Sequence, residues 1–102
     1  MTEETPPENS MDIIKASDIA RDYIMNNFMP WVFMFQIDSI KPNTHEGIYF
    51  VQCSFMPGQG GYTRHYYDLK INIKTGHIDG LKAFSLNIKT GDKKSLEVSP
   101  PK

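Results

Sequence analysis

Residues 62–80 read YTRHYYDLKINIKTGHIDG, and this stretch decides which kind of fold to expect. Over residues 65–73 every second side chain is His65 or an apolar residue, whereas the residues between them are mostly polar. A period of two is typical of a β-strand that buries one face and exposes the other. Lys-Thr-Gly at 74–76 then favours a tight reversal, because glycine readily closes a short hairpin turn with a bulge. We therefore expect a strand over 62–73 and a returning strand over about 77–88, in which Gly80 is a candidate point of interruption.

The same turn occurs twice, since residues 71–76 read INIKTG and residues 86–91 read LNIKTG. Two further strands are expected before the hairpin, over 31–40 (WVFMFQIDSI) and 48–56 (IYFVQCSFM), joined by a turn at 41–44. Both of these segments carry large apolar residues at odd and even positions. A brief strand at 95–98 is possible after the second turn.

A single amphipathic helix is expected over 11–27, with Asn9 or Ser10 as its cap and Pro30 as its end. Because Pro6 and Pro7 hinder a backward extension, residues 1–10 are predicted to be a disordered tail. The predicted fold is α+β: one N-terminal helix packed on a four-stranded antiparallel sheet. Residues 11–90 form its single domain, and residues 91–102 form a partly flexible C-terminal extension.

Composition excludes several classes of protein. The chain has 102 residues, of which 39% are hydrophobic, so one globular domain with a packed core is expected. A formal net charge of -1 provides no overall attraction to nucleic acid or anionic lipid. Cys53 is the only cysteine, which excludes an internal disulfide. The start MTEETPPENS lacks the basic and apolar regions of a signal peptide, and no apolar run approaches about 18 residues, so a cytoplasmic protein is predicted.

No pattern of residues points to catalysis, a metal or a cofactor. His45, His65 and His77 have no nearby partners with metal-ligand spacing. Cys53 lies in an apolar strand, where cysteine usually acts as a small hydrophobe. If Cys53 were a nucleophile, it would need a neighbouring base, and His65 across the hairpin is the candidate. The glycine-rich segment 58–61 leads into a strand, whereas phosphate-binding loops precede a helix. We expect a protein that is not an enzyme and holds no cofactor or metal.

One helix covers only one face of a sheet, so aromatic residues are expected to remain open on the other face. The inference is a homodimer, another protein partner or a ligand. The candidate interaction face comprises Phe33, Phe35, Phe50, Arg64, Tyr66 and Lys70, and the candidate recognition loop comprises Gly58, Gln59, Gly60, Gly61 and Tyr62. Aromatic and basic residues together resemble platforms that stack unpaired bases, but Asp68 and the negative net charge argue against nucleic acid.

The predicted function is a small non-catalytic interaction or regulatory module that uses this sheet face and self-associates. The alternative is a binder of a small apolar ligand or lipid in a gap between helix and sheet, lined by Met25, Phe28 and Met34. Methionine suits such a lining because its thioether side chain adapts to varied shapes.

The segment Tyr66–Gly80 resembles the PepSY-type module and, more broadly, the cystatin-like folds with a helix on a sheet. The resemblance implies a non-catalytic module that binds or restrains another protein, in some cases a peptidase. The chain departs from these families in two respects. It shows no signal segment or membrane anchor, and its loop Gln59-Gly60-Gly61 differs from the Gln-x-Val-x-Gly hairpin of cystatin inhibitors, so protease inhibition is carried over to no residue.

Overall fold

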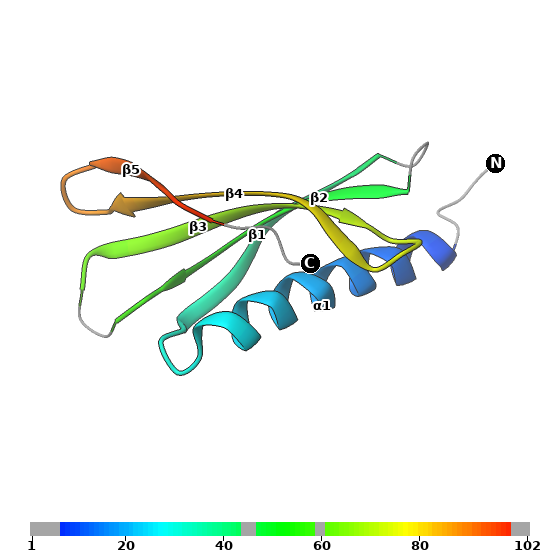
Figure 1. The fold of residues 1–102 in the computed structure, drawn as a ribbon, viewed down its shortest axis with the longest axis horizontal. Coiled ribbons are helices and arrows are strands. Elements are labelled where there is room, and N and C mark those ends of the chain that lie inside the picture. Colours follow the sequence, from blue (N-terminus) through cyan, green and yellow to red (C-terminus); the bar gives the residue numbers. More distant parts are fainter. Residues whose placement is uncertain (1–6, 44–46, 59–60, 99–102) are drawn as a thin grey trace.

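The computed structural model describes residues 7–43, 47–58 and 61–98, which form one helix and five strands. Figure 1 shows the helix along one side of a twisted sheet. The strands pair antiparallel in chain order, β1-β2-β3-β4-β5. The α+β class is confirmed, with five strands where four were expected. The elements are α1 (Pro7–Phe28), β1 (Phe33–Asn43), β2 (Ile48–Met56), β3 (Thr63–Asn72), β4 (His77–Asn87) and β5 (Lys93–Leu96).

Helix α1 starts at Pro7, inside the segment expected to be a tail. Proline is compatible with the first turn of a helix, because the amide hydrogen that it lacks has no partner there. Residues 1–6 of that predicted tail lie outside the described residues. The last turn closes with the Trp31 amide donating to the carbonyl of Phe28 at 2.7 Å.

The helix packs on β1, β2 and β3 through its smallest apolar residues. Ala16, Ala20 and Ile24 are fully buried and recur every fourth residue, the spacing of one helix face. Two alanines allow the helix backbone to approach the sheet closely. The core beneath them comes from alternate residues of the central strands, including Val51, Cys53, Phe55, Tyr67, Leu69 and Ile71.

The register separates the sheet into two faces. Val51 pairs with Leu69 and Cys53 with Tyr67 on the side of the helix, which we call the covered face. The alternation predicted for β3 is confirmed. No described element lies on the opposite side, which we call the open face (Figure 1). The open face carries Phe33 and Lys41 from β1, Phe50, Gln52 and Ser54 from β2, Arg64, Tyr66, Asp68 and Lys70 from β3, Gly80, Lys82 and Phe84 from β4, and Lys93 from β5.

The two Lys-Thr-Gly turns have the same geometry. Gly76 and Gly91 have φ of 75° and 83°, the left-handed conformation that was predicted. Each glycine amide donates at 2.7 Å to the carbonyl of an asparagine, Asn72 or Asn87, that ends the preceding strand. The side-chain oxygen of the same asparagine accepts from the backbone amides of the lysine and the threonine of the turn. The sequence repeat therefore encodes one hairpin turn used twice.

Strand β1 departs most from expectation. It continues through the predicted turn to Asn43 and contains two bulges, between Phe33 and Gln36 and between Ile37 and Ser39. Met34 has φ of 54° at the first bulge, which is unusual for a residue other than glycine. The extra residue puts Phe33 and Phe35 on opposite faces, and Phe35 packs against the core.

Strand β5 lies two residues earlier than the brief strand expected at 95–98, and it pairs with Ala83–Leu86 of β4. Part of the predicted C-terminal extension is therefore a sheet edge. Residues 99–102 lie outside the described residues.

Candidate interaction surface

Two rows of residues cross the open face in register. In the first row, Lys41 pairs with Phe50, Phe50 with Lys70, and Lys70 with Gly80. The second row runs in the same way through Ser39, Gln52, Asp68 and Lys82. A hollow of about 490 Å³ lies over these rows, and all eight residues line it. We call it the open-face hollow.

Gly80 keeps one end of the hollow open. A Cβ atom at this position would lie 3.3 Å from the Cβ of Lys70, a tight contact. A side chain here would therefore crowd Lys70 and fill the space beside it. Glycine within a strand often marks a place where another group approaches closely. Phe50, two strands away, leaves 46% of its surface exposed.

The open-face hollow carries net positive charge. Lys41, Lys70 and Lys82 are all exposed, and Asp68 is the one carboxylate among the lining residues. The amide of Gln52 donates to Asp68 Oδ1 at 2.9 Å, which fixes the position of that carboxylate. Within the described part of the chain the only ion pair within 4 Å joins Arg21 and Asp18. The lysine ammonium groups are thus available to an outside anion.

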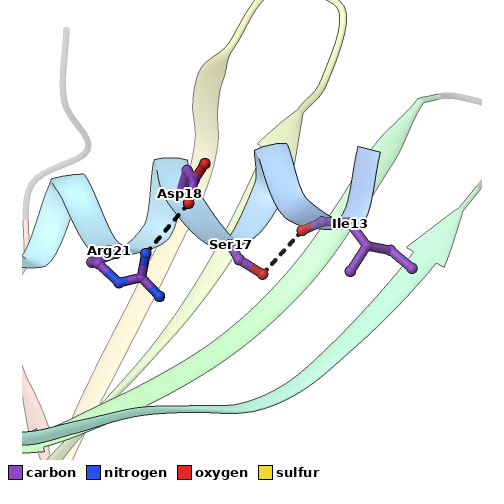
Figure 2. A network of polar contacts seen from close by, with 4 residues as sticks. All are labelled: Ile13, Ser17, Asp18 and Arg21. Carbon is purple, nitrogen blue, oxygen red and sulfur yellow. Dashed lines mark hydrogen bonds and ion pairs between the residues drawn. The ribbon is translucent and has the colours of Figure 1, made fainter. Parts of the chain in front are cut away.

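The ion pair lies on the helix, where Arg21 Nη1 donates to Asp18 Oδ1 at 3.3 Å (Figure 2). Beside it, the Ser17 hydroxyl donates to the carbonyl of Ile13, as Figure 2 shows. These contacts are exposed and local to the helix, so they contribute little to stability. Helix α1 carries four acidic and two basic residues, and its charge is opposite to that of the open-face hollow.

Aromatic rings next to the hollow are already paired. Tyr66 and Phe84 stack with ring centroids 5.0 Å apart and planes 10° apart. Lys93 Nζ lies 4.2 Å from the centroid of Phe84, so this ring is placed between a tyrosine of β3 and a lysine of β5. Lys89 Nζ similarly lies 4.9 Å from the ring centroid of Tyr62. These rings offer less free surface for base stacking than their number in the sequence indicates.

Two residues of the predicted interaction face are not available to a partner. Arg64 is only 8% exposed, and its guanidinium donates to Ser54 Oγ at 2.9 Å and to the carbonyl of Met34 at 2.7 Å. It therefore stabilises the first bulge of β1 instead of presenting a charge. Phe35 belongs to the covered face because of that bulge. Phe33, Phe50, Tyr66 and Lys70 do share the open face, as predicted.

The recognition loop is described only in part. Gln59 and Gly60 lie outside the described residues, whereas Gly58, Gly61 and Tyr62 lie between β2 and β3. Tyr62 is tied to the other end of the sheet, because its carbonyl accepts from the Ile88 amide at 2.7 Å. The loop is thus separate from the open-face hollow, which no motif in the sequence indicates.

Cys53 and His65 belong to the core side of the sheet. Cys53 pairs with Tyr67, whereas His65 pairs with Phe55 and packs against its ring at a centroid distance of 5.7 Å. Burial raises the pKa of the Cys53 thiol to about 12, with Asp38 and Asp68 adding to the effect. Burial also lowers the pKa of His65. A thiol that stays protonated is a poor nucleophile, so this placement favours a packing role.

Stability is expected to fall above about pH 9. The unfolded thiol of Cys53 ionises near its ordinary pKa of 9.0, while the folded thiol remains protonated to about 12. The unfolded state then binds fewer protons, and the free energy of unfolding drops by up to about 1.4 kcal/mol per pH unit. Urea denaturation from pH 7 to 11 measures the slope. Cys53→Ala should flatten the slope of unfolding free energy against pH between pH 9 and 10. An unchanged slope would contradict the raised pKa of Cys53. Above pH 10 Tyr67 adds its own contribution, because burial raises its pKa to about 12 as well.

The residues expected to line an apolar ligand pocket do not surround one. Phe28 packs on Phe55 and Tyr67 at centroid distances of 5.4 and 5.3 Å. Met34 is 74% exposed on β1. A hollow of about 380 Å³ does lie beside the helix, and its lining is polar and apolar in equal parts, without Met25, Phe28 or Met34. It is formed by Ile19, Tyr23, Asn26, Asn27, Gly76, His77, Ile78 and Asp79.

Among the residues that the structure describes, no group of three or more His, Cys, Asp or Glu side chains is placed to hold a metal ion. Helix α1 is not long and apolar enough to cross a membrane. No family model, curated protein or solved structure matches this chain. The resemblance to PepSY-type and cystatin-like modules therefore stays a prediction.

Proposed function

We propose that this protein is a small non-catalytic interaction module that docks on another protein through its open face. The observation that carries the proposal is the open-face hollow, in which a half-exposed phenylalanine lies between lysines that form no ion pair with the described residues. Exposed apolar surface rimmed by polar groups is characteristic of interaction sites.

The face supports docking better than the sheet edge does. Strand β1 is the long edge of the sheet. It contains two bulges, and it also carries the charged Lys41 and the proline Pro42. Bulges, charges and proline all hinder the addition of another strand. A partner is therefore expected to contact side chains of the open face instead of extending the sheet.

A different protein fits this face better than a second copy. Face-to-face pairing of two copies would bring the lysines of both hollows together, and like charges in an interface are unfavourable. Pairing the acidic helix of one copy with the sheet of the next would not close on itself and would produce chains of molecules. Homodimer formation, which the sequence suggested, thus becomes the alternative that a solution measurement decides.

Phe50→Glu is expected to abolish partner binding without unfolding the protein, because Phe50 is half exposed and its ring is central to the hollow. The matched control is Ile14→Glu on the helix, where an apolar residue is 60% exposed on the other side of the molecule. Wild type and both variants are immobilised, and proteins retained from an extract of the source cells are quantified. Loss of the same proteins with Phe50→Glu alone supports the proposal, whereas equal recovery from all three contradicts it.

Light scattering over a concentration series at low and high salt decides between partners. A monomer at all concentrations agrees with docking on a different protein. A dimer that Phe50→Glu dissociates and Ile14→Glu preserves would show that the open face pairs with itself.

A further inference from the structure

Lysines and an apolar ring alternate across the open-face hollow. Phe50 stands directly between Lys41 of β1 and Lys70 of β3 in one row. Neighbouring strands are about 4.8 Å apart, so the backbones that carry these two lysines are separated by roughly 10 Å. The row thus presents one apolar surface with one lysine cation on each side of it.

The second row extends the positive charge and limits where an anion can bind. Lys82 pairs with Asp68, which Gln52 holds in place at 2.9 Å. One carboxylate among three lysines leaves two positive charges in excess. Asp68 also repels an anion from this row, so carboxylates are favoured at Lys82 at its end and at the two lysines of the first row.

The dimensions suit a short extended peptide. Successive residues of an extended chain rise about 3.3 Å and alternate between two faces, so residues one, three and five of a segment share a face that spans roughly 13 Å. The flexible side chains of Lys41 and Lys70 can reach both ends of such a segment from backbones roughly 10 Å apart. The volume of about 490 Å³ lies within the 300–1,000 Å³ that ligand sites commonly occupy. Gly80 leaves room at the end of the row, where a side chain would crowd Lys70.

Single-stranded nucleic acid fits these observations less well. Base stacking needs free ring surface, and Phe84 is placed between Tyr66 and Lys93. A closely spaced row of phosphates would also meet the fixed carboxylate of Asp68.

Building on the function proposed above, we propose that the open-face hollow binds an acidic peptide segment of the partner protein. Two carboxylate side chains four positions apart contact Lys41 and Lys70, and the apolar side chain midway between them, on the same face of the extended peptide, packs on Phe50. Lys82 attracts a further carboxylate, while the room beside Gly80 admits the peptide backbone.

The test uses a fluorescein-labelled peptide in which two glutamates four positions apart flank a leucine midway between them, so that all three side chains share one face when the peptide is extended. Fluorescence anisotropy measures its affinity for the full chain, and amide NMR shifts locate the site. We expect saturable binding that weakens with added salt, with shifts confined to the two rows of the hollow. Replacing the leucine by glycine should weaken binding about tenfold, and Gly80→Val should do the same by filling the hollow while leaving its charges unchanged.

Charge reversal supplies the matched pair of variants. Lys70→Glu with Lys82→Glu should weaken peptide binding at least tenfold, whereas Lys89→Glu with Lys94→Glu should change it less than threefold. The second pair alters the net charge by the same amount at exposed lysines that do not line the hollow. Equal loss in both pairs would overturn the proposal, because binding would then follow net charge alone. Tighter binding of an oligothymidine than of the peptide would overturn it in favour of nucleic acid.

The two proposals fail in different ways. Absence of peptide binding, while Phe50→Glu still loses a partner from the extract, would overturn the acidic-peptide proposal and leave the interaction module intact. Peptide binding at the hollow supports the acidic-peptide proposal on its own, and equal recovery of partners by Phe50→Glu and wild type would then count against the docking function alone.

Discussion

Phe55→Ala is expected to lower the free energy of unfolding by about 3–5 kcal/mol, the range for a large aromatic residue removed from a core. Phe55 is 1% exposed, and its ring contacts three others: Phe28 at 5.4 Å, Tyr67 at 5.8 Å and His65 at 5.7 Å between centroids. Because these rings come from α1 and β3, the cavity loosens the contact between helix and sheet as well. Domains of this size are stable by only about 5–15 kcal/mol, so this loss is a large fraction of the total free energy of unfolding.

Urea denaturation followed by tryptophan fluorescence and circular dichroism measures the loss. Phe50→Ala is the matched control, because the same ring is removed from the same strand β2, but from the open face, where it is half exposed. We expect this control to cost less than about 1 kcal/mol. Similar losses for the two variants would mean that the open face is buried in solution, and therefore that the protein self-associates through it.

The sequence predicted those elements that depend on local pattern. Strand β2 begins and ends as expected, because most of its nine residues are apolar and turn residues bound it on both sides. Strands β3 and β4 agree within one or two residues, since the alternation of one and the Lys-Thr-Gly turn between them act over short distances. The turn that occurs twice was visible as a repeat of six residues. Its asparagine and glycine form the same hydrogen bonds in both copies.

Elements that depend on distant contacts were not predictable in the same way. Helix α1 starts at Pro7 although proline was expected to exclude it, because proline disfavours only the helix interior. The first bulge of β1 is held by a hydrogen bond from Arg64, thirty positions after Met34 in the chain, and no pattern within residues 31–43 reveals it. Each bulge moves later side chains to another face, so the sides of Phe33 and Phe35 could not be assigned from alternation alone.

The open-face hollow was predicted only in part for the same reason. Phe50 and Lys70 were expected on one face because they lie on strands whose alternation or pairing was clear. Lys41 was assigned to a turn, and Lys82 was not singled out. Gly80 was the one available signal, since glycine within a strand often marks close approach, but only the register across four strands places it opposite Lys70.

The second large effect is expected at Arg64. Arg64→Ala should lower the free energy of unfolding by about 2–4 kcal/mol, because it leaves the carbonyl of Met34 and the hydroxyl of Ser54 without their charged donor. Arg64 is buried, and in the described residues no carboxylate pairs with it, so hydrogen bonds to neutral groups are what hold its charge. The first bulge of β1 is expected to loosen first, since Met34 adopts its positive φ while its carbonyl accepts from this guanidinium.

Two further variants separate the hydrogen bonds from the packing of the side chain. Arg64→Met keeps an apolar stem of similar length but donates nothing, and Arg64→Lys keeps the charge but lacks the planar fork that reaches both β1 and β2. If the hydrogen bonds dominate, chemical denaturation should give Arg64→Met a free energy of unfolding close to that of Arg64→Ala. The free energy of unfolding of Arg64→Lys should then lie between those of Arg64→Ala and wild type. Amide exchange should then rise selectively in β1 near Met34. A methionine variant as stable as wild type would contradict this, because it would mean that the cost of burying the charge cancels the hydrogen bonds, as occurs for some buried ions. Arg64 would then contribute by fixing the bulge, and through it the face on which Phe33 lies, without adding net stability.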